Sequence, residues 1–176
     1  MKVLIYGHKG WIGKQVLDLL KNHTVIMGNV RVNNKKDLEM EILNSGCTHI
    51  MSFIGRTHGK IDEKEYTTID YLEQKGKLYE NVRDNLFSPV LLALLAKKHD
   101  KHFTYLGTGC IFKFDDDHPF GEEINGFDES SVPNFFDSSY SVVKGFTDEL
   151  MHLLDSNTLF AIEYQALSFP CGLSLA

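Results

Sequence analysis

Short apolar runs alternate along the chain with segments whose apolar residues recur every three to four positions. The runs are five to seven residues long, which is typical of strands buried in a parallel sheet, and they lie at 2–6, 24–28, 49–54, 103–107 and 158–164. Helical spacing is found between them, at 12–20, 37–43, 78–95 and 140–154. This alternation predicts an α/β fold with a doubly wound parallel sheet in the strand order 3-2-1-4-5.

Two stretches between the third and fourth runs are less regular. Residues 60–77 are polar and charged, and we expect a surface helix and a connection there. Residues 78–95 contain Pro89, which has no backbone N–H, so the helix should either kink there or restart with Ser88 as its cap. Asn85 would be buried in this helix if it binds the backbone of a neighbouring strand.

The first run is followed at once by a glycine-rich turn, and a helix follows the turn. Gly7 would permit the tight turn, Gly10 would let backbone approach a pyrophosphate, and Gly13 would let the helix pack close to the strand. The helix start, at Trp11 and Ile12, offers backbone amides and a positive dipole end to phosphates. This context predicts a Rossmann-like dinucleotide site; the alternative is a capping turn whose glycines serve packing only.

The residues after the second run favour NADP over NAD. NAD-binding versions of this fold carry an acidic residue there for the ribose hydroxyls. Here Arg31 follows, with Lys35 and Lys36 soon after, and no acidic residue precedes Asp37. We expect Arg31 to bind the 2′-phosphate of NADP, although these cations could also simply solvate a loop and a helix start.

Composition restricts the partners. A length of 176 residues suits one domain, and 43% hydrophobic and 24% charged residues are ordinary globular values. The net charge of -6 does not favour nucleic acid or an anionic membrane, and no apolar run approaches the length of a membrane span. The three cysteines have no zinc spacing, so we expect no metal site, reduced thiols and a cytoplasmic location. An uncovered sheet edge would favour association into a homo-oligomer.

Four reactive side chains follow the fourth run. Thr108 and Cys110 stand at its carboxyl end, where open α/β sheets bind ligands, and Tyr140 and Lys144 share one face of the next helix. A tyrosine with an ordinary pKa of about 10 needs a nearby ammonium to exchange a proton with a carbonyl oxygen near neutral pH. Lys144 could supply that charge and bind the nicotinamide ribose, and Thr108 could be a second donor to the carbonyl. A Tyr-x-x-x-Lys spacing alone is common by chance.

Taken together, the glycine turn, Thr108 and Tyr140-x-x-x-Lys144 resemble the extended short-chain dehydrogenase/reductases. The longer strings YGHKGWIGK, GTGCIF, FDDDHPFG and GFDESSVPNFFDSSYSVVKG are similar to the bifunctional epimerase/reductases of nucleotide-rhamnose synthesis. The resemblance covers residues 1–164, which we interpret as an NADP-binding Rossmann domain that carries the catalytic residues.

The resemblance implies an activity and residue roles. This family takes a nucleotide-linked 4-keto-6-deoxyglucose, inverts C3 and C5, and reduces the C4 ketone with NADPH. Cys110 would be one acid/base in the epimerisation, and Tyr140 would protonate the C4 oxygen. The alternative for Cys110 is a buried apolar filler, as most free cysteines are.

The chain departs from the family pattern near its end. The family continues with Arg-x-Arg-x-Pro and a substrate subdomain, whereas residues 165–176 form a tail without a match. We therefore expect a truncated product that lacks the second epimerisation acid/base. Two other functions stay open: a simple 4-keto-sugar reductase that uses Thr108, Tyr140 and Lys144, and a non-catalytic NADP-binding regulatory subunit.

Overall fold

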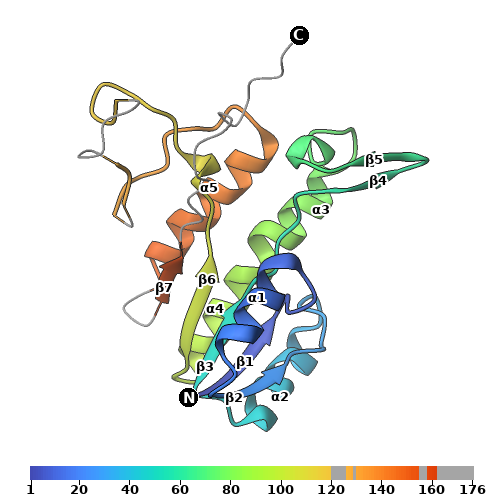
Figure 1. Cartoon of the computed structure of the whole chain (residues 1–176), viewed down its shortest axis with the longest axis vertical. Coiled ribbons are helices and arrows are strands. Elements are labelled where there is room, and N and C mark those ends of the chain that lie inside the picture. The colour runs from blue at the N-terminus through green and yellow to red at the C-terminus, as the bar shows by residue number, and fades with distance from the viewer. Residues whose placement is uncertain (120–125, 129, 155–157, 162–176) are drawn as a thin grey trace.

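A computed structural model describes residues 1–119, 126–128, 130–154 and 158–161, the last of these as backbone only. Five parallel strands form its central sheet, in the order β2-β1-β3-β6-β7 (Figure 1). They are β1 (Lys2–Tyr6), β2 (Thr24–Met27), β3 (His49–Ser52), β6 (His102–Leu106) and β7 (Thr158–Ala161). The predicted domain boundary at residue 164 and the tail after it lie outside the described residues.

The order of these strands corrects one prediction. In the order 3-2-1-4-5 the third strand would lie beside the second, but β3 pairs with β1, with Val3 opposite His49 and Tyr6 opposite Ser52. An inner strand of a doubly wound sheet is buried on both faces. β1 meets this condition along Val3–Tyr6, whereas no residue of β2 is fully buried. β2 therefore suits the edge, and β1 lies between β2 and β3.

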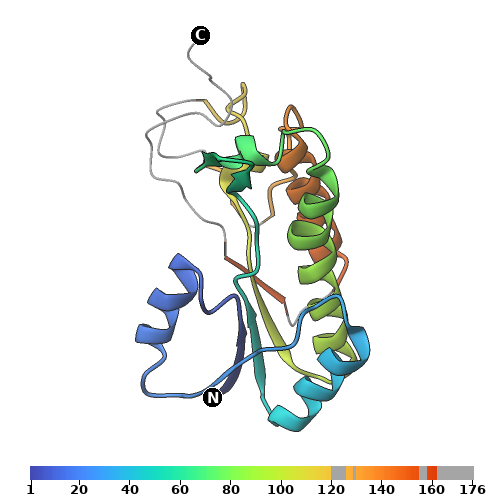
Figure 2. The ribbon, with the colours of Figure 1, turned by 90° about the vertical axis from the view of Figure 1, so that its right-hand side faces the viewer.

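Helices cover both faces of the sheet, as predicted for a doubly wound fold (Figure 2). α1 (Trp11–Leu19) lies on one face, and α2 (Lys35–Ser45), α4 (Ser88–Lys98) and α5 (Ser139–His152) lie on the other. The main core fills the space between the sheet and this second set of helices; its members include Leu4, Ile50, Phe103, Leu38, Ile42, Leu92 and Met151. Within the part of the chain that the structure describes, no helix has the length and apolarity needed to cross a membrane.

The long helix of residues 78–98 neither stops nor restarts at Pro89. α3 (Leu78–Val82) passes into the π-helical turn η2 (Arg83–Phe87), which continues into α4. The backbone of Ser88 is helical, so Ser88 is not a cap, and its N–H donates to the carbonyl of Arg83, five residues earlier. Because Pro89 has no N–H to give the Asn85 carbonyl, that carbonyl accepts the Thr147 hydroxyl of α5 instead, at 2.8 Å.

The prediction of a surface helix within 60–77 is wrong. This segment forms an antiparallel hairpin of β4 (Gly59–Ile61) and β5 (Lys64–Tyr66), which projects from the body in Figure 1, followed by the 3₁₀ turn η1 (Ile69–Tyr71). Asp62 takes the left-handed conformation that a tight hairpin turn needs, with φ 51°. A polar, exposed hairpin lacks the apolar periodicity that would distinguish it from a polar helix.

Candidate functional site

A pocket of about 430 Å³ opens at the carboxyl ends of β1, β2 and β3. Its wall consists of the turn after β1, the loops after β2 and β3, and the part of the long helix around η2. β2 and β3 flank β1 on opposite sides, so the chain reverses its direction across the sheet at this point. Such a switch point is where open α/β sheets bind ligands, and the volume lies within the roughly 300–1,000 Å³ of small-molecule sites.

The glycine turn forms one side of this pocket. Gly7 has φ +76°, and a Cβ there would lie 2.4 Å from the carbonyl carbon of Phe53 on the neighbouring chain segment. A Cβ on Gly13 would lie 2.3 Å from the Gly7 oxygen, so both positions exclude any larger residue. Gly10 lines the pocket and is the N-cap residue of α1, where it has no side chain to bond the first amides of the helix. Close packing and open amides therefore occur in the same turn.

The other predicted cofactor residues divide between the pocket wall and its surroundings. Arg31 lines the pocket, while Trp11 and Ile12 follow Gly10 in the first turn of α1, outside the wall, and Trp11 is 75% exposed. Glu41 of α2 fixes the loop before Arg31 by accepting the N–H of Asn29 at 2.8 Å.

Positive charge is concentrated around the pocket even though the chain is acidic overall. Among the described residues, its charged lining is four cations and one carboxylate: Lys9, Arg31, Arg56, Arg83 and Asp84. The chain contains only three arginines, and all three line this pocket. Arginine binds phosphate in a planar, two-pronged geometry, so the lining favours a phosphorylated ligand.

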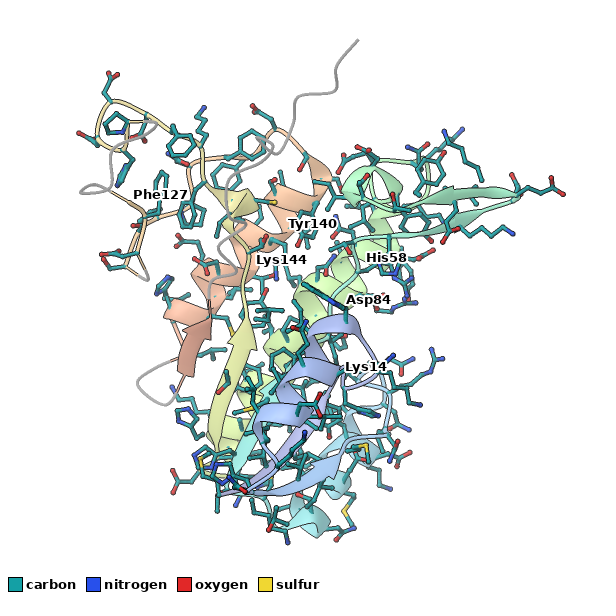
Figure 3. All side chains as sticks on the ribbon, in the orientation of Figure 1. Lys14, His58, Asp84, Phe127, Tyr140 and Lys144 are labelled. Atoms are coloured by element: carbon teal, nitrogen blue, oxygen red, sulfur yellow. The ribbon has the colours of Figure 1, made fainter. Side chains whose placement is uncertain are left out.

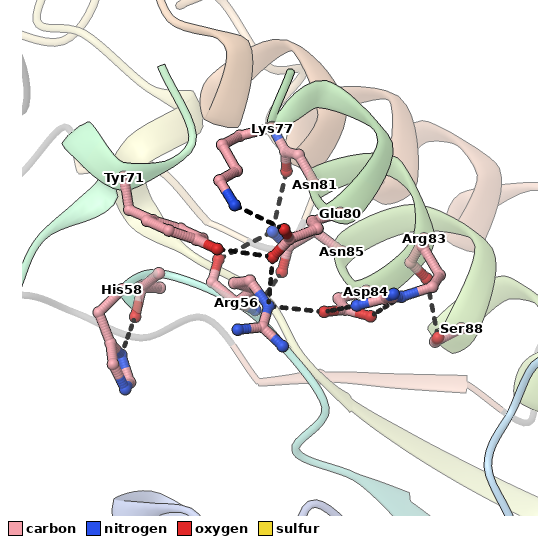
Figure 4. Close-up of polar contacts among 11 residues, drawn as sticks. Arg56, His58, Tyr71, Lys77, Glu80, Asn81, Arg83, Asp84, Asn85 and Ser88 are labelled. Carbon is pink, nitrogen blue, oxygen red and sulfur yellow. Dashed lines mark hydrogen bonds and ion pairs between the residues drawn. The ribbon is translucent and has the colours of Figure 1, made fainter. Parts of the chain in front are cut away.

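A polar network joins the loop after β3 to the long helix (Figure 4). The side chain of Asn85 is 1% exposed, accepts the N–H of Arg56 at 2.7 Å and donates to the carbonyl of the same residue at 2.8 Å. The expected burial of Asn85 against backbone is therefore confirmed. Asn85 also donates to Asn81, which donates in turn to Ser139 at the start of α5. The network thus links the pocket to the helix that carries Tyr140.

The second half of the site lies at the carboxyl end of β6. Thr108 and Cys110 are both buried in and around the 3₁₀ turn η3 (Gly109–Ile111), and the Thr108 hydroxyl accepts the N–H of Cys110 at 3.3 Å. Ser141 of α5 donates to the Cys110 carbonyl at 2.7 Å. Cys110 and Tyr140 belong to one buried cluster with Tyr71 and Leu72. The structure therefore brings together the two motifs, which are some thirty residues apart in the chain.

Tyr140 and Lys144 lie on α5 where it faces the centre of the molecule (Figure 3). Both are buried, at 6% and 4% exposure. The Lys144 ammonium donates to the hydroxyl of Tyr105 and, at 3.2 Å, to the carbonyl of Leu106. Burial, together with Tyr140 and Asp148, raises the pKa of Tyr105 well above its usual value. Tyr105 therefore stays neutral, and its oxygen can accept this bond.

The sequence predicts reduced thiols. Cys47 is free and buried in the main core, as expected for a reduced thiol. The predicted acid/base function of Cys110 requires its thiol, because the thiol carries the exchangeable proton.

Sequence reasoning missed Arg56, Asp84 and Tyr105. Arg56 had one available signal, because it stands two residues beyond the third apolar run, at the ligand-binding edge of the sheet. Asp84 and Tyr105 had none, because their partners, Arg56 and Lys144, lie 28 and 39 residues away in the chain.

No protein-family model matches the chain. A UDP-rhamnose synthase from Acanthamoeba polyphaga mimivirus is 50% identical; its structure superimposes with a TM-score of 0.81 and covers 91% of this chain and 54% of that one. A trifunctional UDP-glucose 4,6-dehydratase/UDP-4-keto-6-deoxy-D-glucose 3,5-epimerase/UDP-4-keto-L-rhamnose-reductase of Arabidopsis thaliana is 32% identical over 158 residues, 89% of this chain and 22% of that protein. The resemblance to nucleotide-rhamnose epimerase/reductases is thus confirmed.

More distant structures share the fold. A dTDP-4-dehydrorhamnose reductase from Bacillus anthracis, in complex with NADP, superimposes with a TM-score of 0.69 at 17% identity and covers 92% of this chain and 53% of that one. The chain spans about half, or less, of the length of the curated relatives it matches.

Proposed function

We propose that this chain binds NADPH and contributes to the conversion of a nucleotide-linked 4-keto-6-deoxy-D-glucose to nucleotide-L-rhamnose, by 3,5-epimerisation and then 4-keto reduction. The observation that carries this proposal is the pocket at the switch point of the sheet, lined by the glycine turn and by every arginine of the chain. The likeness to a UDP-rhamnose synthase supports the substrate class.

The residues present fit a phosphorylated dinucleotide. Gly10 and the uncapped start of α1 would hold the pyrophosphate, and Arg31 would bind the 2′-phosphate that distinguishes NADPH from NADH. Bound NADPH would supply the hydride for the C4 carbonyl. Lys144 would hold the nicotinamide ribose, in addition to its contacts with Tyr105 and Leu106.

Thr108 and Tyr140 would act on the C4 oxygen of the sugar. Tyr140 would donate the proton that turns the ketone into an alcohol, with the Lys144 ammonium one helical turn away to stabilise its phenolate. The Thr108 hydroxyl would be a second donor to the same oxygen. Both side chains are buried, so water competes little for these bonds.

Cys110 in its thiol form would exchange the protons at C3 and C5, which the neighbouring ketone makes acidic. We place the protein in the cytoplasm because a reducing compartment keeps this thiol available. A second candidate function is a 4-keto-sugar reductase that needs only Thr108, Tyr140 and Lys144, and the burial of these three side chains favours it.

Incubation with the 4-keto-6-deoxy nucleotide sugar and NADPH in deuterated water, with a thiol reductant, tests the proposal. Epimerisation and reduction predict deuterium at C3 and C5 together with NADPH oxidation. Oxidation without deuterium at these carbons would support the simple reductase. Binding of NADPH with neither reaction would support a regulatory subunit.

A cysteine variant assigns the proton exchange. Cys110→Ala should abolish exchange at C3 and C5 and leave NADPH affinity unchanged. Cys47→Ala is the matched control, because Cys47 is buried in the main core just before β3, at the opposite end of the strands from Cys110. Exchange retained in Cys110→Ala would remove Cys110 from the mechanism.

A further inference from the structure

Arg56 lines the pocket from the loop after β3, where no sequence motif assigns it a function. Its backbone is held on both sides by the buried side-chain amide of Asn85, through the two hydrogen bonds of 2.7 and 2.8 Å. Asn85 is itself bound to Asn81, at 2.9 Å. One buried side chain thus fixes both backbone polar groups of Arg56, so the position of this residue is closely determined.

The side chain of Arg56 is held at one edge only. Its Nε donates a hydrogen bond to the Asp84 carboxylate at 2.7 Å. The same carboxylate accepts hydrogen bonds from Nε and Nη2 of Arg83 at 2.6 and 2.8 Å. The Nε edge also lies 3.7 Å from the Glu80 carboxylate, and the two terminal nitrogens of Arg56 form no hydrogen bond within the described part of the chain. Figure 4 shows them turned away from Asp84. Four N–H donors, in the geometry that matches two phosphate oxygens, are thus left to the pocket.

Two consecutive residues of the π-helical turn form hydrogen bonds with Arg56. Within η2, Asp84 holds the side chain of Arg56 while the next residue, Asn85, holds its backbone. A π turn widens the helix by one residue per turn and is frequent at functional sites. Ser88 stabilises it, because its hydroxyl donates to the Arg83 carbonyl at 2.8 Å.

We propose that Arg56 binds the pyrophosphate of the dinucleotide and that Asp84, held by Arg83, positions it. This inference rests on the proposed function. Arg56 shares its pocket with Gly7 and Gly10, the turn that would hold the pyrophosphate, whereas Arg31 stands after β2, where the adenosine ribose binds in this fold. A carboxylate in a pocket for an anion weakens binding by its charge, so Asp84 improves binding only through the orientation that it gives to Arg56.

Titrations of the protein with NADPH and with NADH test the contact, because only NADPH has the 2′-phosphate. Arg56→Gln should weaken binding of both nucleotides by about tenfold or more, the effect expected for a lost charge-assisted bond. Arg56→Lys, which keeps the charge and loses the two-pronged geometry, should fall between the wild type and Arg56→Gln. Lys60→Gln, an exposed change on the hairpin, is the control for charge and should alter affinity less than about twofold.

Asp84→Asn distinguishes two effects of Asp84 on nucleotide binding: the orientation that it gives to Arg56 and the repulsion by its own negative charge. Removal of this negative charge should strengthen nucleotide binding if charge alone mattered, whereas a positioning residue predicts weaker binding of both nucleotides. Tighter binding by Asp84→Asn would overturn the positioning role. Unchanged affinity in both Arg56 variants, or a loss restricted to NADPH, would overturn the pyrophosphate contact. If the wild type bound neither nucleotide, the proposed function itself would fail.

Discussion

The pocket beside β1 and the side chains at the end of β6 lie along the same edge of one sheet, yet their polar groups are arranged differently. In the pocket, Arg31 and the terminal nitrogens of Arg56 face a space of about 430 Å³. At the end of β6, Lys144 binds Tyr105 and Leu106, and Ser141 binds the Cys110 carbonyl. The pocket presents donors to a ligand, whereas the second region holds its groups in bonds with one another. We infer that the first region serves affinity and the second serves chemistry.

Tyr140→Phe should separate the two regions most sharply. Loss of the phenol removes the proposed proton donor, so reduction of the 4-keto sugar should slow by about 10²- to 10⁴-fold, the usual contribution of general acid catalysis. NADPH affinity should change little, because the ring remains in its buried cluster. Rates of NADPH oxidation and a binding titration provide the two measurements.

Tyr79→Phe is the matched control for this change. Tyr79 is 73% exposed on α3, so loss of its hydroxyl should alter neither rate nor affinity. A near-normal rate in Tyr140→Phe would exclude Tyr140 as the acid, and the division of labour between the two regions would then need another proton donor.

Gly7→Ala should damage the pocket region at the level of folding. The residue has φ +76°, and its new Cβ would lie 2.4 Å from the backbone of Phe53. Gly76 has a similar φ of +83°, but a Cβ at that position would have no described atom within 4 Å. Gly76→Ala should therefore cost about 1–2 kcal/mol of unfolding free energy for conformation alone, and Gly7→Ala about 3 kcal/mol or more.

Urea unfolding of both alanine variants measures the difference. Equal losses would mean that Gly7 is required only for its backbone conformation and not for the close approach of the turn to β3.

These contrasts show how much the sequence could predict. The run at 2–6, the turn after it and the Tyr-x-x-x-Lys spacing are local patterns, and the structure has each of them as expected. The side of the sheet on which β3 pairs is not local, because it depends on which strand can tolerate an exposed edge. The same applies to the Lys144–Tyr105 and Arg56–Asp84 pairs, which arise only when distant segments pack.

Asp84→Asn should also change how stability depends on pH. Burial alone would raise the pKa of Asp84, but hydrogen bonds from Arg83 and Arg56 more than offset it and hold the pKa below its usual value of 3.8. A carboxylate with a depressed pKa stabilises the fold above its ordinary pKa, and this contribution is lost as pH falls through the folded-state pKa.

The variant should therefore be less stable than the wild type by about 1–3 kcal/mol at pH 7, and the difference should shrink as the pH falls below 4. Thermal unfolding across this range measures it. A difference that stayed constant with pH would show that the Asp84 charge does not stabilise the pocket wall.

Glu73→Ala should have the smallest effect on the free energy of unfolding. Glu73 binds the start of α5, the helix that carries Tyr140. The Glu73 carboxylate accepts the N–H groups of Ser139 and Tyr140 at 3.0 and 3.1 Å, where the dipole of α5 favours negative charge. Glu73 is exposed, and Ser138 caps the same helix, so the loss should be only about 0.5–1 kcal/mol. Glu65→Ala, an exposed change on the hairpin, controls for charge, and hydrogen exchange at the first amides of α5 should rise in Glu73→Ala alone. Equal exchange in the two variants would mean that Ser138 is sufficient to hold this end of the helix, and with it Tyr140, against the end of β6.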